Sequence, residues 1–433
     1  MSHEFNNKIG RREFLGTAAA AAGLMIIKPE LVRGTEANSA LRLGILGCGG
    51  RGTAVGGGSE EGGGFVGNTN TRVVALADLF PDQLQKARER FDNVQKSKGY
   101  PAIDEKQLFA GPKAYEEIAH SKEVDFILIT TPPYFHPHHL DTVVKAGKHV
   151  YCEKPVAVDV PGAHHVMEIG KRAEGKLSLD VGFQIRKAPP MVELTKRIQE
   201  GALGKISCGL AHYYCGHIDR PDWPDAAPQV KKLRNWVWYR DLSGDIIVEQ
   251  NIHVIDMCNW MIGAHPEKAT GCWSRKYRSD AGNCADNFNA LLTYPGDMQV
   301  SFGSCQFGTP AFDAAVRLFG TDGSSEAHYD SRVFISGKNA WDAGLGGSKD
   351  STQFSAAGTF KGSLDQADSE KQKAYVESIT SNQFHNQAQQ GAESALSAML
   401  ARNAAYSGKT LTWEELLKSK EVYDPKIDIE KMA

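Results

Sequence analysis

Two short apolar segments, one followed by glycines and the other by an acid, constrain the fold of this chain more than any other feature. Leu41–Leu46 (LRLGIL) leads directly into residues 47–52, which read GCGGRG, and Arg72–Ala77 (RVVALA) ends at Asp78. A strand, a glycine turn, a helix start, a second strand and an acid occur in this order in a dinucleotide-binding parallel sheet. The G-x-G-x-x-G spacing alone is weak evidence, but the two strands and the acid supply the context that it requires.

Each glycine of this turn has its own physical task. Gly47 permits the tight turn, Gly49 lets a pyrophosphate approach the backbone, and Gly52 lets the helix pack closely on the strand. The first N–H groups of the helix would then face the anion. Asp78 is placed to bind the diol of the adenine ribose, which predicts NAD in preference to NADP because a 2′-phosphate would meet its charge. The predicted cofactor residues of the turn are Gly47, Gly49, Gly50, Arg51 and Gly52.

Three further glycines, Gly56–Gly58, stand where this turn should launch its helix. Asp78 also lies further from Gly52 than the roughly 20 residues of the usual unit, and the excess falls within Gly56–Asn70. We therefore expect a short first helix, followed by a surface loop that runs to Asn70.

Strands alternate with helices over residues 41–182. Apolar strands are expected at Val124–Thr130, His149–Cys152 and Leu177–Gly182, and helices at Pro81–Val94, Leu140–Ala146 and Gly162–Glu174. Such alternation is typical of a parallel sheet that is covered on both faces. The sequence thus predicts an α/β fold whose first domain, residues 41–182, is a doubly wound Rossmann sheet.

The pattern changes after about residue 183. Longer strands are expected at Ile206–Tyr214, Phe288–Tyr294 and Met298–Phe302, while residues 215–242 form a long connection rich in Trp, Tyr, Pro and charge, and residues 337–369 a loop. Residues 183–433 therefore predict a second α/β domain with an open, mainly antiparallel sheet. An open sheet often buries its face in a partner, so we expect a homo-oligomer.

Residues 1–40 are expected to be a signal peptide that is not part of the fold. Arg11 and Arg12 precede a weakly apolar run, Ala18–Ile27, which is shorter than the roughly 20 apolar residues of a membrane span. This order is typical of a twin-arginine (Tat) export signal. It predicts a protein that is periplasmic or otherwise exported, without stable membrane insertion after cleavage. A compartment without a nucleotide pool would also require a cofactor that stays bound.

The composition argues against two classes of partner and against a metal. The chain has 433 residues, of which 23% are charged, and a formal net charge of −3. This balance gives no bias toward nucleic acid or anionic membranes. The eight cysteines form no C-x-x-C pair, so we expect no metal site and mostly buried thiols.

Two later segments carry groups suited to proton transfer. Glu153-Lys154-Pro155 follows an apolar strand, and the carboxyl ends of parallel strands line the ligand crevice. Glu249–Met261 (EQNIHVIDMCNWM) is expected to be one helix, with Glu249, His253, Asp256 and Trp260 on one face. A carboxylate one helical turn from an imidazole can orient it and raise its basicity. A solvated lysine and a surface salt bridge are the alternatives when each segment is considered alone.

Taken together, these motifs resemble one family. GCGGRG, Asp78, TPPYFHPHH, EKP, GFQIR and NIHVID occur in the order seen in the glucose–fructose oxidoreductase / inositol dehydrogenase / MocA (Gfo/Idh/MocA) family, over residues 41–420. The resemblance implies a Rossmann domain, a C-terminal domain with an open antiparallel sheet, a bound nicotinamide cofactor, and sugar or cyclitol substrates. It makes Lys154 the family's lysine and His253 its catalytic histidine. Glu249 stands where many members carry an aspartate.

The resemblance also assigns contacts around the cofactor and the substrate. His136 matches a histidine near the nicotinamide end, and Gln184 falls where substrate or cofactor contacts occur. Besides the glycine turn, the implied cofactor residues are Asp78, Thr130, Pro132, His136, Glu153 and Lys154. The implied substrate residues are Lys154, Arg186, Tyr239 and His253, and the catalytic set is Lys154, His253 and Glu249.

Three hypotheses follow for the whole protein. In the first, a dehydrogenase, His253 takes the hydroxyl proton, Lys154 stabilises the developing charge, and Glu249 orients His253. Aromatic residues of the long connection, which either stack on sugar faces or pack in the core, are Trp223, Trp236, Trp238 and Tyr239. In the second, the same site cleaves glycosides through transient oxidation, elimination and re-reduction. In the third, the protein is a non-enzymatic, cofactor-binding scaffold. The sequence does not separate the first two.

Overall fold

A parallel six-stranded sheet forms the first part of the fold. The computed structural model describes residues 39–58, 63–329, 332–344 and 366–432, and Leu41–Ala433 cluster as one compact unit. The strand order is β3-β2-β1-β4-β5-β6, and every pairing is parallel. The strands are β1 Leu41–Leu46, β2 Thr71–Asp78, β3 Leu108–Ala110, β4 Phe126–Ile129, β5 His149–Cys152 and β6 Leu179–Val181. The predicted doubly wound sheet is therefore confirmed. Its order reverses between β1 and β4, where such sheets bind ligands.

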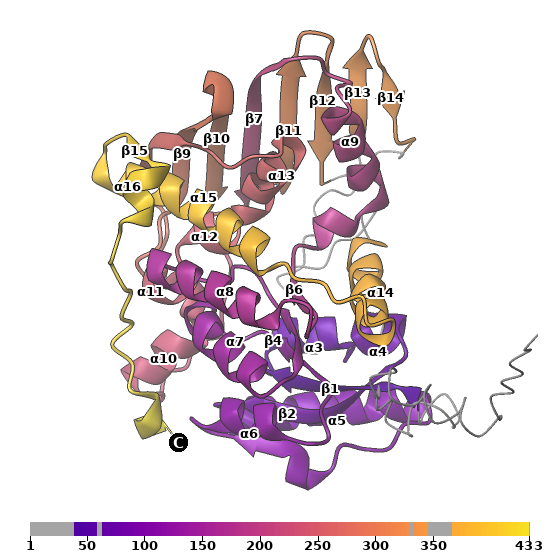
Figure 1. The fold of residues 1–433 in the computed structure, drawn as a ribbon. Helices are drawn as coiled ribbons and strands as arrows, with labels where there is room; N and C mark the ends of the chain where they lie inside the picture. Colours follow the sequence, from indigo (N-terminus) through magenta and orange to yellow (C-terminus); the bar gives the residue numbers. More distant parts are fainter. Residues whose placement is uncertain (1–38, 59–62, 330–331, 345–365, 433) are drawn as a thin grey trace, which may run out of the picture. The chain divides into compact units, whose positions relative to one another are not determined.

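Helices cover both faces of this sheet (Figure 1). They are α3 Gly50–Gly56, α4 Gly64–Asn68, α5 Pro81–Ser97, α6 Ala114–His120, α7 His136–Lys145, α8 Val160–Ala173 and, from late in the chain, α14 Gln366–Thr380. On one face, Phe91 of α5 and Tyr375 of α14 share a buried cluster with Phe126 of β4. On the other, Leu140 of α7 packs with Ile127 of β4. Because both faces are buried, β4 is apolar at every position (FILI).

The glycine-rich insertion is only partly as predicted. The first helix is short, since α3 has seven residues and ends at Gly57 with φ 98°. The expected surface loop to Asn70 is wrong, however, because Gly64–Asn68 form α4, in which Phe65 is fully buried. The Phe65 ring meets those of Phe126 and Tyr151 edge-on, with centroids 5.2 and 5.3 Å away. Residues 59–62 lie outside the described residues. The insertion thus adds a piece of core.

A nine-stranded mixed sheet forms the second part. Its order is β14-β13-β12-β11-β7-β10-β9-β8-β15, and only β7 and β10 pair in parallel. The strands are β7 Ile206–Cys215, β8 Lys268–Ser274, β9 Asn287–Tyr294, β10 Met298–Gln306, β11 Asp313–Gly320, β12 Gly323–His328, β13 Val333–Gly337, β14 Trp341–Asp342 and β15 Leu411–Thr412. The predicted mainly antiparallel sheet is confirmed. The boundary between the domains at residue 182 stays a prediction.

Helices pack on one face of this second sheet and leave side chains of the other face exposed. The remaining helices are α9 Pro189–Gln199, α10 Pro228–Arg234, α11 Arg240–Ser243, α12 Ile246–Glu249, α13 Ile252–Ile262, α15 Ala388–Ser407 and α16 Trp413–Leu417. Of these, α9, α13 and α15 lie against the sheet (Figure 1). Along β7, Leu210 and Tyr214 are exposed, whereas Ala211 and Tyr213 are buried, as alternation in a strand requires.

No helix within the described ranges is both long and apolar enough to span a bilayer.

Candidate active site

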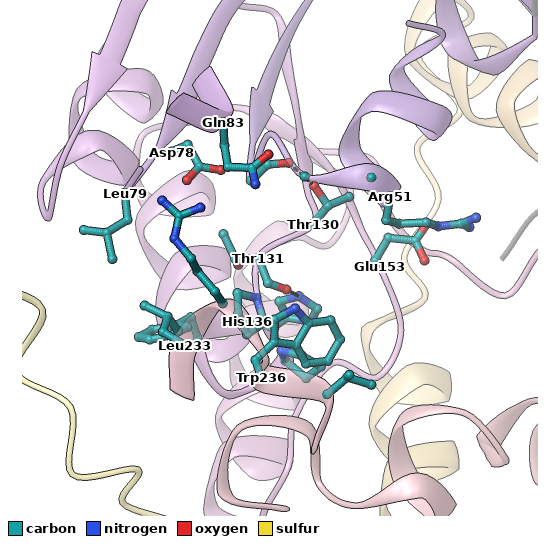
Figure 2. A pocket seen from close by; sticks show the side chains of 18 of the residues that line it. Arg51, Asp78, Leu79, Gln83, Thr130, Thr131, His136, Glu153, Leu233 and Trp236 are labelled. Carbon is teal, nitrogen blue, oxygen red and sulfur yellow. Dashed lines mark hydrogen bonds and ion pairs between the residues drawn. The ribbon is translucent and has the colours of Figure 1, made fainter. Parts of the chain in front are cut away.

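A cavity of about 600 Å³ lies at the carboxyl ends of the parallel strands. Leu46 ends β1, Asp78 ends β2, and Thr130 and Glu153 follow β4 and β5; all four line the cavity. Figure 2 shows Asp78, Gln83 and Thr130 on the side of the Rossmann sheet, and Leu233 and Trp236 from the second part of the chain across from them. The fold thus places the predicted cofactor turn and the long connection in one cavity.

The glycine turn has the conformation that a dinucleotide requires. Gly47 has φ +99°, and a Cβ atom there would lie 2.8 Å from the Thr130 backbone. A Cβ atom at Gly52 would lie 2.0 Å from the Gly47 carbonyl oxygen, so helix α3 meets strand β1 without space for a side chain. Gly49 and Gly50 line the cavity, and a Cβ atom on either would meet nothing within 4 Å. These two residues form an open cradle at a helix start, which fits a pyrophosphate.

Asp78 is held at the cavity wall by the backbone. Its carboxylate accepts hydrogen bonds from the Cys48 N–H at 2.7 Å and from the Phe80 N–H at 2.8 Å. Burial raises the pKa of Asp78, and these two donors oppose that rise. The carboxylate is thereby fixed beside the glycine turn, where the fingerprint places the ribose hydroxyls.

Arg51 and Glu153 form a partly buried ion pair that joins the turn to the end of β5. The Arg51 Nη2 atom lies 2.9 Å from Glu153 Oε1 and 3.9 Å from Asp368 Oδ1 of α14. Burial acts to lower the pKa of Arg51, but the two carboxylates outweigh it and raise that pKa. Both residues line the cavity, as do Thr130 and Pro132. The Thr130 hydroxyl donates to the Gly47 carbonyl at 2.6 Å, which ties β4 to the turn.

His136 lines the cavity as predicted, but its ring nitrogens contact the backbone. Nε2 lies 2.7 Å from the Thr131 carbonyl oxygen, and Nδ1 lies 2.7 Å from that of Pro155. The residue is 1% exposed, and burial lowers its pKa. A neutral imidazole donates only one of these two hydrogen bonds. His136 therefore connects the loops after β4 and β5, and both of its ring nitrogens contact backbone carbonyl oxygens.

Lys154 pairs with Glu249, which corrects the predicted Glu249–His253 pair. The Lys154 Nζ atom lies 2.5 Å from the Glu249 carbonyl oxygen and 3.4 Å from its Oε1 atom. The expected single helix is also wrong, because Glu249 ends α12 and His253 belongs to α13. The break arises where the Asn251 N–H bonds to the Ile246 carbonyl, five residues back. It removes the one-turn spacing on which the predicted pair rested.

His253 lines the cavity with a neutral, unbonded imidazole. It is 7% exposed, and among the described residues no hydrogen-bond partner reaches its ring; Nδ1 is fully buried. The rings of Phe183 and Tyr329 pack edge-on against it. Burial, and then the positive charges of Lys154 and Arg51, lower the pKa of His253 well below its ordinary value. The neutral form carries the free lone pair that a base needs, and the neighbouring positive charges keep His253 in that form.

Two predicted substrate residues lie outside the cavity lining. Arg186 is bound by Asp256, with Nε 2.9 Å from Oδ2, and its guanidinium lies 5.3 Å from the centroid of the Trp260 ring. Tyr239 stacks on Lys232. Asp256 and Trp260 of α13 therefore hold Arg186 away from the cavity lining. Of the aromatic residues in the long connection, Trp223 and Trp236 line the cavity, while the Trp238 indole N–H donates to the Ile218 carbonyl.

Several lining residues were missed by the sequence analysis. Beyond the Rossmann sheet, the cavity wall includes Tyr213, Arg220, Leu233, Arg234, Gln250 and Ile429. Arg234 lies between two rings, with its guanidinium carbon 3.9 Å from the Phe80 centroid and 4.3 Å from that of Trp223. It also binds both oxygens of Asp82 on the other side of the cavity. For the lining residues within 215–242, the charge and aromatic content of that segment was the only signal in the sequence.

The described residues contain no cluster of three or more His, Cys, Asp or Glu side chains that is arranged to hold a metal ion. All eight cysteines are free thiols, and five of them are buried: Cys48, Cys152, Cys215, Cys258 and Cys284.

Comparison with known proteins gives the family of this chain. Residues 41–181 match the oxidoreductase family with an NAD-binding Rossmann fold, Gfo/Idh/MocA, and residues 191–326 match the Gfo/Idh/MocA C-terminal domain. The chain is 22% identical over 272 residues to inositol 2-dehydrogenase from Rhizobium meliloti, covering 62% of this chain and 72% of that enzyme. It is 26% identical over 195 residues to an inositol 2-dehydrogenase/D-chiro-inositol 3-dehydrogenase from Lactiplantibacillus plantarum, covering 45% of each chain.

The solved structures extend the likeness to the whole fold. Scyllo-inositol dehydrogenase from Lactobacillus casei, with bound NAD(H) and scyllo-inositol, superposes with a TM-score of 0.62 at 16% identity, over 87% of this chain and 99% of that one. Two family matches that together run from the first strand of the Rossmann sheet into β12 decide the assignment. The chain belongs to the Gfo/Idh/MocA oxidoreductase family, and it is an NAD(P)-dependent oxidoreductase.

Proposed function

We propose that the protein transfers hydride between NAD and a CH–OH group of a sugar or cyclitol. One observation supports this most strongly: Lys154 and His253 line the same cavity as the glycine turn and Asp78. The similarity to inositol dehydrogenases supports the substrate class. No observation favours the glycoside-cleaving alternative.

In the proposed mechanism one residue accepts the proton and a second stabilises the developing negative charge. When bound, the nicotinamide ring exchanges a hydride with the substrate carbon. His253 is neutral, so it can take the hydroxyl proton of the alcohol. Lys154 would stabilise the negative charge that develops on the same oxygen. Glu249 contacts Lys154 through both its carbonyl and its carboxylate, and it therefore positions the lysine and not the histidine.

We propose NAD as the cofactor, with NADP disfavoured. Asp78 lies at the end of β2 with both carboxylate oxygens engaged by N–H groups, which holds its charge in place. A 2′-phosphate on the adenine ribose would lie against that charge.

We also propose that the cofactor is held tightly. Arg234 binds Asp82 of the Rossmann part while Phe80 and Trp223 enclose its guanidinium. These contacts attach the cavity wall that carries Arg234 to the Rossmann part, on the side of the cavity where the adenosine of the cofactor would lie.

Retention of the cofactor would suit a protein exported by the Tat pathway with Arg11 and Arg12 in its signal, which lies outside the described residues. Replacing both arginines by lysine, followed by cell fractionation, tests that export; unchanged export would refute it.

The function itself is tested on purified protein. Denatured protein should release NAD(H) in near-stoichiometric amount, as measured by mass spectrometry. Added sugars or cyclitols should change the absorbance of the bound cofactor. Lys154→Met and His253→Asn should each slow this change by about 100-fold or more, while Arg90→Met, an exposed residue of α5, serves as control. Full activity in both site variants would refute the proposal.

The homo-oligomer remains a proposal as well. The face of the second sheet that carries Leu210 and Tyr214 is the surface we expect a second copy to cover. Light scattering of wild type and of Leu210→Glu tests it, and a wild-type monomer would refute it.

A further inference from the structure

Four cationic side chains line the cavity, and three of them have a carboxylate partner. Arg51 pairs with Glu153, Lys154 with Glu249, and Arg234 with Asp82. The fourth is Arg220 of the long connection. Across the residues that the structure describes, no ion pair or hydrogen bond engages its guanidinium, and its Nε atom is fully buried. The Trp236 ring lies against the guanidinium, with its centroid 5.8 Å from the guanidinium carbon.

This isolation is energetically unfavourable in the free protein. Burial lowers the pKa of Arg220, which means that its charge has lost hydration, and Glu249 opposes that effect only at longer range. Stacking on a tryptophan offsets only part of that lost hydration. Arg220 is only partly exposed, and a cation in such a place is ordinarily paired, so the missing partner of Arg220 calls for an explanation.

The position of Arg220 indicates what the partner is. Its charge is felt by Glu249, the residue that holds Lys154, and it stacks on Trp236, which also lines the cavity. The glycine cradle for the pyrophosphate is lined instead by Gly49 and Gly50, with Arg51 beside them. Arg220 therefore belongs to the substrate end of the cavity, together with Lys154 and His253.

We propose that Arg220 binds an anionic group of the substrate, so that this oxidoreductase acts on an acidic carbohydrate. The planar guanidinium matches the two oxygens of a carboxylate or of a phosphate. A sugar acid and a sugar phosphate share this chemistry, and the experiment below separates them. The inference rests on the proposed function for its reacting group, but the binding it describes is measured without turnover.

The binding experiment uses thermal shift on wild type, Arg220→Met, Arg220→Lys and the control Arg90→Met, each with its bound cofactor. The probes are glucose, glucuronate and glucose 6-phosphate. Wild type should be stabilised by one anionic probe and much less by glucose. The anion that stabilises it identifies the charged group. Arg220→Met should weaken binding of that anion by about 10- to 100-fold, as expected for a charged hydrogen bond, and Arg220→Lys should weaken it less.

A second measurement keeps the test decisive if turnover is not detected. Without any probe, Arg220→Met should melt at the wild-type temperature or above, because it removes an unpaired and partly buried charge. A lower melting temperature would show a structural role and overturn the inference. Equal binding of glucose and both anions by wild type would overturn it as well, and so would loss of cofactor from Arg220→Met. Failure of every carbohydrate to react, with anion binding intact, would count against the proposed function alone.

Discussion

Replacing Gly49 and Gly52 separately by alanine should uncouple cofactor binding from stability. Both glycines belong to the same six-residue turn, but their surroundings differ. A Cβ atom at Gly49 meets nothing within 4 Å, and its backbone angles, φ −73° and ψ −168°, suit alanine. A Cβ atom at Gly52 would lie 2.0 Å from the Gly47 carbonyl oxygen and 2.6 Å from the Thr130 hydroxyl. Only the first site is open to a ligand.

The expected losses of stability follow from these distances. Ordinary contact begins near 3.4 Å, so Gly52→Ala requires the backbone to move by more than 1 Å. Overpacking of this kind costs about 1–3 kcal/mol and sometimes more, and a backbone neighbour places this case at the upper end. Because each kcal/mol shifts the melting temperature by roughly 2–4 °C in a domain of this size, Gly52→Ala should melt about 6–12 °C lower. Gly49→Ala should melt within about 2 °C of wild type when cofactor is absent.

The assay pairs differential scanning fluorimetry with NAD titration of cofactor-stripped protein. Gly49→Ala should bind NAD about 10- to 100-fold more weakly, which corresponds to about 1.4–2.8 kcal/mol. Gly63→Ala would be unsuitable as a control because its φ is +92°. Gly50→Ala is also unsuitable, since Gly50 lines the same cradle. Arg90→Met, remote from the turn, serves instead.

One result would refute the reasoning about the cradle. If Gly49→Ala binds NAD as tightly as wild type while remaining folded, the open space at Gly49 is not where the pyrophosphate lies. If Gly52→Ala keeps the wild-type melting temperature, the close contact between α3 and the Gly47 carbonyl is not a constraint on the fold.

Three further predictions concern single side chains. Asp78→Asn removes the charge but supplies one acceptor oxygen where the carboxylate offers two, so one of the two N–H groups loses its partner. Loss of a repulsion of about 1–4 kcal/mol should raise the ratio of NADP to NAD affinity at least about fivefold; an unchanged ratio would contradict our assignment of Asp78. Arg234→Ala breaks both bonds to Asp82 and should speed release of NAD by about tenfold in a competition assay, whereas an unaltered release rate would show that this contact does not retain the cofactor. The rate of alcohol oxidation should stay constant as the pH falls through the ordinary histidine pKa near 6.5 and should drop only below it. The reason is that His253 has a lowered pKa and loses its base form only when it is protonated. A drop centred at or above that value would exclude His253 as the base.

The parts of the site that the sequence predicted are local in the chain. The glycine turn follows directly from β1, and its conformations are dictated by a missing Cβ atom at Gly47 and Gly52. These six residues predict the turn once the flanking strands and Asp78 supply the context. Lys154 was likewise placed in the cavity because it follows a strand. Such features can be predicted from residues adjacent in the sequence and from the rule that parallel strands end at a common edge of the sheet.

The parts that were mispredicted depend on distant partners. Helix α4 was read as loop because its two core residues stand among glycines, and Phe65 packs on Tyr375, which arrives from α14 late in the chain. Arg186 was assigned to the substrate, but Asp256 of α13 binds it and Ser394 of α15 donates to the same carboxylate. Periodicity within one segment carries no information about such pairs.

Among these differences from the sequence prediction, the break between α12 and α13 has the largest effect on the chemistry expected of His253. With Glu249 and His253 on one continuous helix, the carboxylate would raise the basicity of the imidazole and would also favour its charged form. The structure instead gives the carboxylate to Lys154 and leaves His253 beside a cation, with its pKa lowered. The imidazole is then held in its neutral form, which is the form that accepts the hydroxyl proton in alcohol oxidation. Carbonyl reduction would require His253 to bind a proton first, and its lowered pKa opposes that step, so the site favours His253 as a base over His253 as an acid.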